Sequence, residues 1–196
     1  MVSKKTILTP LLAAGALLAS SSVFAAGPTA ETLAGTCSAC HGYQGNSVGI
    51  MPSIAGSTAE YFTDTMKAFK SGERKATVMG RVAKGYSDED IGKMAGYFSQ
   101  QKPVGMKQSF DRTDAALGKK LHDEYCEKCH EDGGRNNEEG PVLSGQSKLY
   151  LTYSMEDFKM SHREGPKKMS KKVKSMVEKH GKGGVDAVLN YYASQQ

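Results

Sequence analysis

All four cysteines of the chain fall in two copies of one pattern, Cys-x-x-Cys-His, at 37–41 and 126–130. Two thiols at this spacing can add across the vinyl groups of a porphyrin, and the histidine that follows can reach the iron from one side. Thioether links of this kind suit an oxidising compartment, where free thiols do not persist. The pattern therefore predicts two covalently bound haem c groups. The thiols that would hold them are Cys37, Cys40, Cys126 and Cys129.

Three other uses of this pattern fit the sequence less well. A thioredoxin-like redox pair needs a βαβ context, which the sequence does not indicate. Four cysteines and two histidines exceed what one four-coordinate zinc ion requires. Disulfides within Cys-x-x-Cys would close very short loops, and such loops stabilise a fold weakly.

Each iron then needs a second axial ligand opposite His41 or His130. Met79 follows His41 by 38 residues (79 − 41), and Met169 follows His130 by 39 (169 − 130). Both methionines lie in polar stretches that we expect to be irregular loops, between a middle helix and the last helix of each half. These spacings favour His41/Met79 and His130/Met169 as the two axial pairs.

The remaining methionines and histidines have other expected roles. Met66, Met94 and Met155 lie on apolar helical stripes and are expected in the core. Met51 and Met160 are the alternative sixth ligands of the first and second half. We expect a solvated surface position for the other histidines, which are His122, His162 and His180.

A filled His/Met site stabilises ferrous iron and leaves no position for oxygen or peroxide to bind. This favours electron transfer over catalysis by this chain alone. A dihaem peroxidase, with one iron left open, is the alternative of a different class, and the matched pair Met79 and Met169 argues against it.

The two motifs mark an internal repeat, because other residues recur at the same offset of 89 (126 − 37). Pro52, Gly45, Gly56 and Tyr61 match Pro141, Gly134, Gly145 and Tyr150. Near each end, two stripes with i, i+3, i+4, i+7 spacing predict a terminal helix. Their members are Ile91, Met94, Ala95 and Phe98, and Val185, Val188, Leu189 and Tyr192. Ser87 and Asp90 suggest a capping box for the first of these helices. We therefore expect a small helical haem domain at 26–101, a linker at 102–106 and a second domain at 107–196.

The first 25 residues have the order of a secretory signal peptide. Lys4 and Lys5 precede an apolar run at Ile7–Leu18, and small residues lead to a predicted cleavage after Ala25. The apolar run is shorter than the roughly 20 residues that span a bilayer. We expect an exported, periplasmic protein without a membrane span.

The formal net charge of +5 is too small to suggest nucleic-acid binding. One run is strongly basic, with seven lysines between Lys167 and Lys182 and only Glu178 opposing them. Either a solvated helix face or a docking surface for an acidic partner would explain it.

Several longer stretches resemble a known family. They are Gly27–Glu31, Gly45–Ser47, Phe69–Glu73, Met79–Ser87, Lys93–Phe98, Lys107–Phe110, Leu121–His130 and Tyr192–Gln196. With them the chain resembles class I cytochromes c, and more closely the cytochrome subunit of flavocytochrome c sulfide dehydrogenase. The segment Asn136–Gly140 and the lysine run depart from that pattern.

The resemblance implies an all-α fold of two tandem class I cytochrome c domains, each around one haem c. It implies that the carbonyls of Pro52 and Pro141 support the axial histidines. It also implies a flavoprotein partner whose FAD oxidises sulfide, in a heterodimer that passes electrons to a small soluble cytochrome c. The chain has no G-x-G-x-x-G fingerprint of its own for a flavin. A free dihaem carrier that serves a terminal oxidase is the alternative.

Overall fold

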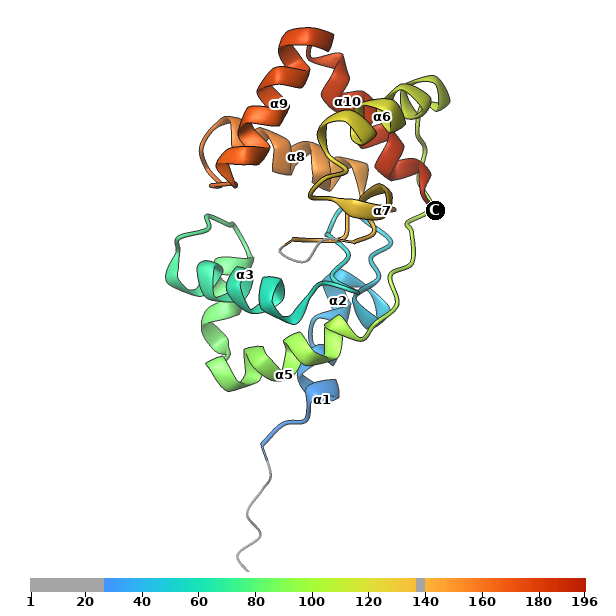
Figure 1. The fold of residues 1–196 in the computed structure, drawn as a ribbon. Helices are drawn as coiled ribbons and strands as arrows, with labels where there is room; N and C mark the ends of the chain where they lie inside the picture. The colour runs from blue at the N-terminus through green and yellow to red at the C-terminus, as the bar shows by residue number, and fades with distance from the viewer. Residues whose placement is uncertain (1–26, 137–139) are drawn as a thin grey trace, which may run out of the picture.

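The structure, a computed structural model, describes residues 27–136 and 140–196. The predicted signal peptide at 1–25 lies outside these residues. Figure 1 shows two groups of helices, one above the other, joined by a segment without helices at residues 100–111. The first group comprises α1 (Ala30–Gly35), α2 (Ser38–His41), α3 (Ala59–Ser71), α4 (Met79–Val82) and α5 (Asp88–Ser99). The second comprises α6 (Arg112–Tyr125), α7 (Glu131–Gly134), α8 (Lys148–Lys159), α9 (Lys167–His180) and α10 (Gly183–Ser194).

The first core is built on α5, which packs against α1 and α3. The predicted stripe is confirmed, because the four residues that form it are all buried: Ile91, Met94, Ala95 and Phe98. Phe98 stacks on Phe62 of α3 with ring centroids 5.4 Å apart. The predicted capping box is also confirmed, since Ser87 and Asp90 exchange side-chain-to-backbone hydrogen bonds at the start of α5.

The second core is built on the crossing of α6 and α10. The predicted stripe of α10 is buried as expected, with Val185, Val188, Leu189 and Tyr192 in one cluster. The two helices approach closely at Gly118, where an added Cβ would lie 2.0 Å from the Ala187 carbonyl oxygen. Glycine is therefore required at residue 118 by backbone contact.

The predicted repeat is visible in the backbone hydrogen bonds. The Gly45 carbonyl accepts from the N–H groups of Ile54 and Ala55, at 2.8 and 3.2 Å. At the offset of 89, the Gly134 carbonyl accepts from Leu143 and Ser144 at 2.8 and 3.1 Å. Gly45 and Gly134 both have positive φ, at 80° and 87°, which glycine adopts without a steric penalty. The two halves thus share one fold.

The expectation of an irregular stretch is confirmed for residues 75–78, which lie outside the helices, but it is wrong for Met79 and Met169 themselves. Met79 is the first residue of α4, and Met169 lies in the first turn of α9. In α9 the spacing of Met169, Val173 and Met176 is helical, and Pro166 stands just before the helix, where its missing N–H costs nothing. The lysines between them are good helix formers, so polarity alone did not indicate a loop.

Among the residues that the structure describes, two hydrogen-bonded contacts join the halves. The Gln146 side chain accepts from the Ser53 N–H at 2.9 Å and donates to the Ser53 carbonyl at 3.0 Å. Gln146 is only 3% exposed. Elsewhere, the Arg163 guanidinium donates to the Tyr61 hydroxyl at 3.2 Å. These contacts hold two separately packed cores in one arrangement.

Within the described ranges, no helix is both long and apolar enough to cross a membrane.

Candidate haem-binding sites

The first Cys-x-x-Cys-His motif forms the short helix α2 and the residue before it. Cys37 is half-buried against the first core, and Cys40 is exposed. No disulfide joins Cys37 and Cys40. The His41 N–H donates to the Cys37 carbonyl at 2.9 Å, which closes the turn that holds thiol and imidazole together.

His41 is presented as a neutral ligand. Its ring is buried, and Nδ1 lies 2.7 Å from the Pro52 carbonyl oxygen. A carbonyl can only accept, so Nδ1–H donates and Nε2 keeps the lone pair that a metal requires. Burial lowers the pKa of His41, although the Pro52 hydrogen bond opposes this change. The ring is therefore uncharged at neutral pH.

The second motif begins where α6 ends. Cys126 caps the helix, and its N–H donates to the His122 carbonyl at 2.7 Å. Burial raises the pKa of the Cys126 thiol to about 11. The His130 N–H donates to the Cys126 carbonyl at 2.9 Å, the same distance as in the first motif. Burial, with a smaller effect of His122, lowers the pKa of His130 to about 4, so its ring is neutral as well. Pro141 is half-buried just beyond the segment that the structure does not describe.

The candidate sixth ligands lie on elements separate from the motifs. Met79 is half-buried and packs against the same core cluster as Cys37. Met169 is half-buried, on the α9 face that Val173 and Met176 continue into the second core. The alternatives Met51 and Met160 are exposed, at 39% and 56%. Met66 and Met94 are buried in the first core and Met155 packs against the second, as predicted.

These groups fit haem c. Each half offers two thiols in the Cys-x-x-Cys spacing of haem attachment, a neutral imidazole next to them in the sequence and a soft thioether on another element, which is the donor set for His/Met iron. In the first half, the segments around Pro52 and Met79 also expose large apolar side chains that a porphyrin face could cover. They are Val48, Ile50, Met51, Val78 and Val82.

His122 is not on the surface, and the expectation for it is wrong. It is fully buried between α6 and α10, where Nδ1 lies 2.9 Å from the Tyr192 hydroxyl and Nε2 bonds the Glu127 carboxylate. In the first half, buried Leu33 and Phe98 stand at the matching places in the repeat. The mismatch of leucine with histidine at the 89-residue offset was the feature that could have revealed this network.

The Glu127 carboxylate connects this network to the second motif. It accepts from the backbone N–H groups of Asp132 and Gly133 at 3.0 and 3.2 Å, just after His130. Hydrogen bonding from His122 is the main cause that lowers the pKa of Glu127. Ionised Glu127 therefore fastens the turn beyond His130 to a buried ring of α6.

The other two histidines lie at the surface as predicted. His162 is half-exposed beside Asp157, and His180 ends α9.

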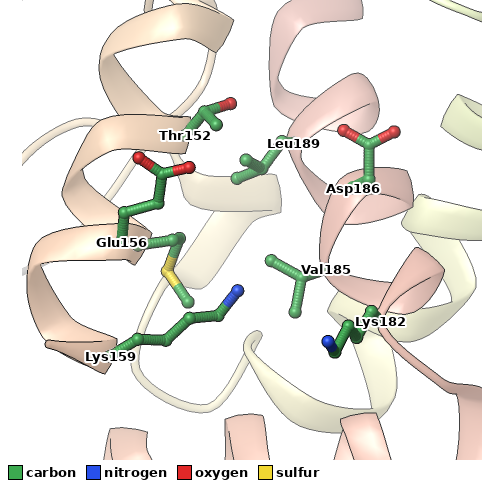
Figure 2. A pocket seen from close by; sticks show the side chains of 8 residues that line it. Thr152, Glu156, Lys159, Lys182, Val185, Asp186 and Leu189 are labelled. Carbon is green, nitrogen blue, oxygen red and sulfur yellow. The ribbon is translucent and has the colours of Figure 1, made fainter.

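A small cavity of about 120 Å³ between α8 and α10 is a different feature (Figure 2). It is lined by Thr152, Met155, Glu156, Lys159, Lys182, Val185, Asp186 and Leu189. None of the residues predicted to bind haem is among them, so we do not assign the cavity to the candidate sites.

Residues 28–102 match the cytochrome c family. A cytochrome subunit of sulfide dehydrogenase from Chlorobaculum tepidum is 45% identical over 101 residues, which cover 45% of this chain and 92% of that relative. The chain belongs to the cytochrome c family. This cytochrome c therefore carries covalently bound haem c.

Two further relatives extend across both halves of this cytochrome c. Cytochrome c4 from Azotobacter vinelandii is 32% identical over 148 residues, 66% of this chain and 70% of the relative. The crystal structure of reduced cytochrome c4 from Pseudomonas stutzeri superimposes with a TM-score of 0.71 at 28% identity, and covers 87% of this chain and all of the other. The predicted all-α fold of two tandem class I cytochrome c domains is thereby confirmed.

Proposed function

We propose that this dihaem electron-transfer cytochrome c is the cytochrome subunit of a sulfide dehydrogenase. It would take electrons from the flavin of a separate flavoprotein subunit and pass them to a small soluble cytochrome c. The observation that carries the proposal is the 45% identity to a sulfide dehydrogenase cytochrome subunit. That relative matches over about half of this chain, whereas the cytochromes c4 match over both halves.

The residues support an electron relay in which protein ligands would fill both axial positions of each iron. Haem c supplies a reversible one-electron change at iron. His41 with Met79, and His130 with Met169, would hold the irons, and both imidazoles are neutral and so able to bind. The Pro52 carbonyl keeps the His41 ring in one tautomer and one orientation. We assign Pro141 the same role for His130 from its place in the repeat.

The cysteines and the interface supply rigidity. Thioether links at Cys37, Cys40, Cys126 and Cys129 would keep each haem from leaving the protein. The Gln146–Ser53 and Arg163–Tyr61 contacts fix one domain against the other. A fixed geometry suits electron transfer, because the electron moves without rearrangement of the chain.

We place the protein in the periplasm, after removal of residues 1–25. A free dihaem carrier, which would deliver electrons to a terminal oxidase, is the second candidate. The similarity to cytochrome c4 across both halves favours it.

Purification of the natively expressed protein separates the two candidates. We expect a complex that shows both haem and flavin absorbance, and in which added sulfide reduces the haem. Elution at the mass of this chain alone, with haem absorbance and no flavin, would replace the first candidate with the free carrier.

A further inference from the structure

The lysine run forms a surface at the predicted sixth-ligand side of the second haem. α9 turns its apolar residues inward, and Met176 is buried in the second core. Five lysines of the first two turns are exposed, and one of them, Lys172, lies near the Tyr125 ring. We call the other four the lysine face: Lys167, Lys168, Lys171 and Lys174. They flank Met169, the half-buried candidate ligand, at the start of α9. The lysine face is therefore next to the predicted sixth-ligand position of the second haem.

Part of the lysine run has partners within the chain, and the lysine face largely has none. Lys179 bonds Glu124 of α6 at 3.0 Å, and the Lys172 ammonium lies 5.9 Å from the centroid of the Tyr125 ring. Within the described residues, no ion pair involves Lys167, Lys168 or Lys171. Lys174 pairs with Glu178 at 3.8 Å on an exposed surface, where such a pair contributes little.

The lysine face is also unfavourable for the helix that carries it. The amino end of a helix has a partial positive charge, which repels cations in the first turn. The first turn of α9 contains no acidic residue, in contrast to α5, whose first turn holds Asp88, Glu89 and Asp90. A solvated helix face alone does not require this arrangement, whereas a surface that attracts anions does.

The composition of the face indicates a transient partner. Permanent interfaces are more hydrophobic than transient ones, and the outer side of α9 offers no large apolar side chain to bury. A surface patch of one charge sign instead steers a soluble partner of the opposite sign and raises its rate of association. This argues against the permanent flavoprotein subunit as the occupant.

We propose that the lysine face docks an acidic, soluble redox protein that takes electrons from the second haem. One electron would leave the ferrous iron and reduce the oxidised centre of that protein, and no bond would form or break. The inference rests on the proposed function only in that electrons leave this chain for another soluble protein. It adds the exit domain and the charge of the acceptor.

Two inorganic oxidants of opposite charge test the steering. The haem-loaded full chain is reduced and mixed in stopped flow with ferricyanide or with tris(phenanthroline)cobalt(III). In the variant Lys167→Gln, Lys168→Gln, Lys171→Gln, Lys174→Gln, we expect the rate constant for ferricyanide at low salt to fall about tenfold and that for the cobalt complex to rise. High salt should remove both differences.

A matched variant carries the same change of charge elsewhere, at the exposed residues Lys67, Lys102, Lys107 and Lys120. It should change either rate constant less than about twofold. An equal effect of the two variants would overturn the proposal, because net charge alone would then account for the rates.

Amide NMR with poly-L-glutamate as the acidic surface tests the location. We expect chemical-shift changes concentrated at residues 167–174, and their loss in the lysine-face variant. Changes spread over all lysines, or concentrated in the first domain, would contradict the proposal. Neither experiment uses sulfide or a flavoprotein, so failure here and failure of the proposed donor are distinguishable.

Discussion

At the scale of single residues, the two haem domains differ at two buried positions, one just before each Cys-x-x-Cys-His motif and one on each terminal helix. The first domain buries Leu33 and Phe98 there, and the second buries His122 and Tyr192. Both ring nitrogens of His122 have partners, Nδ1 in the Tyr192 hydroxyl and Nε2 in the Glu127 carboxylate, so each polar atom of the buried ring is satisfied. The second domain therefore relies on a polar network where the first relies on apolar packing.

Tyr192→Phe should destabilise the second domain by about 1–3 kcal/mol, because the buried His122 nitrogen loses its partner and cannot reach water. Tyr43→Phe, at a side chain that is 79% exposed, is the control and should change little. The measurement is the free energy of unfolding of the haem-loaded protein in denaturant. Equal effects of the two substitutions would show that the hydroxyl contributes nothing.

The pH dependence of stability should involve Glu127. Its pKa in the folded protein lies below the usual 4.5, so it stabilises the fold above about that pH and the contribution is lost as the pH falls through the folded pKa. Glu127→Gln should therefore cost stability at neutral pH and progressively less on acidification. Thermal unfolding of both proteins between pH 3 and 7 checks this. A loss of stability in the variant that grows toward low pH would contradict the stabilising role of ionised Glu127.

At the scale of elements, what could be predicted depended on whether the information was local. The stripes of α5 and α10 and the capping box at Ser87 follow from neighbours on one helix, and all were predicted correctly. The start of α9 was missed because lysines were taken as a mark of a loop. The surface assignment of His122 failed because its partner Tyr192 is 70 residues away.

Gly118→Ala should strongly destabilise the second domain. The new Cβ would meet the Ala187 backbone at 2.0 Å, and backbone atoms cannot move aside as a flexible side chain does. We expect a loss of at least about 2 kcal/mol in the free energy of unfolding.

Gly92→Ala in α5 is the matched control, since no atom lies within 4 Å of its added Cβ. Alanine should stabilise that helix by about 0.5–1 kcal/mol. If both glycine variants gain stability, the close crossing of α6 and α10 is incorrect.

At the scale of the whole molecule, the domain interface is the part that the sequence could least predict. Gln146 lies 93 residues from Ser53, and no spacing rule relates them. The repeat predicts two similar domains, but it says nothing of the surface on which they meet. The two axial pairs, in contrast, were expected from spacing alone and await a direct test.

Gln146→Ala should weaken the coupling between the domains. It leaves the Ser53 N–H and carbonyl without their partner in a partly buried place, at a cost of about 1 kcal/mol or more. Differential scanning calorimetry of the haem-loaded protein should show one transition in the wild type and two in the variant. A single transition in the variant, shifted as a whole, would show that other contacts hold the domains together.

The central claim is that two closed His/Met irons make this cytochrome c an electron relay. The near-infrared band of the Fe–Met bond, recorded on the oxidised protein, tests it most directly. Wild type should show the intensity of two bonds, Met79→Leu and Met169→Leu should each remove half, and the double variant should show none. A wild-type band with the intensity of a single Fe–Met bond, or a band whose intensity neither substitution changes, would contradict the account.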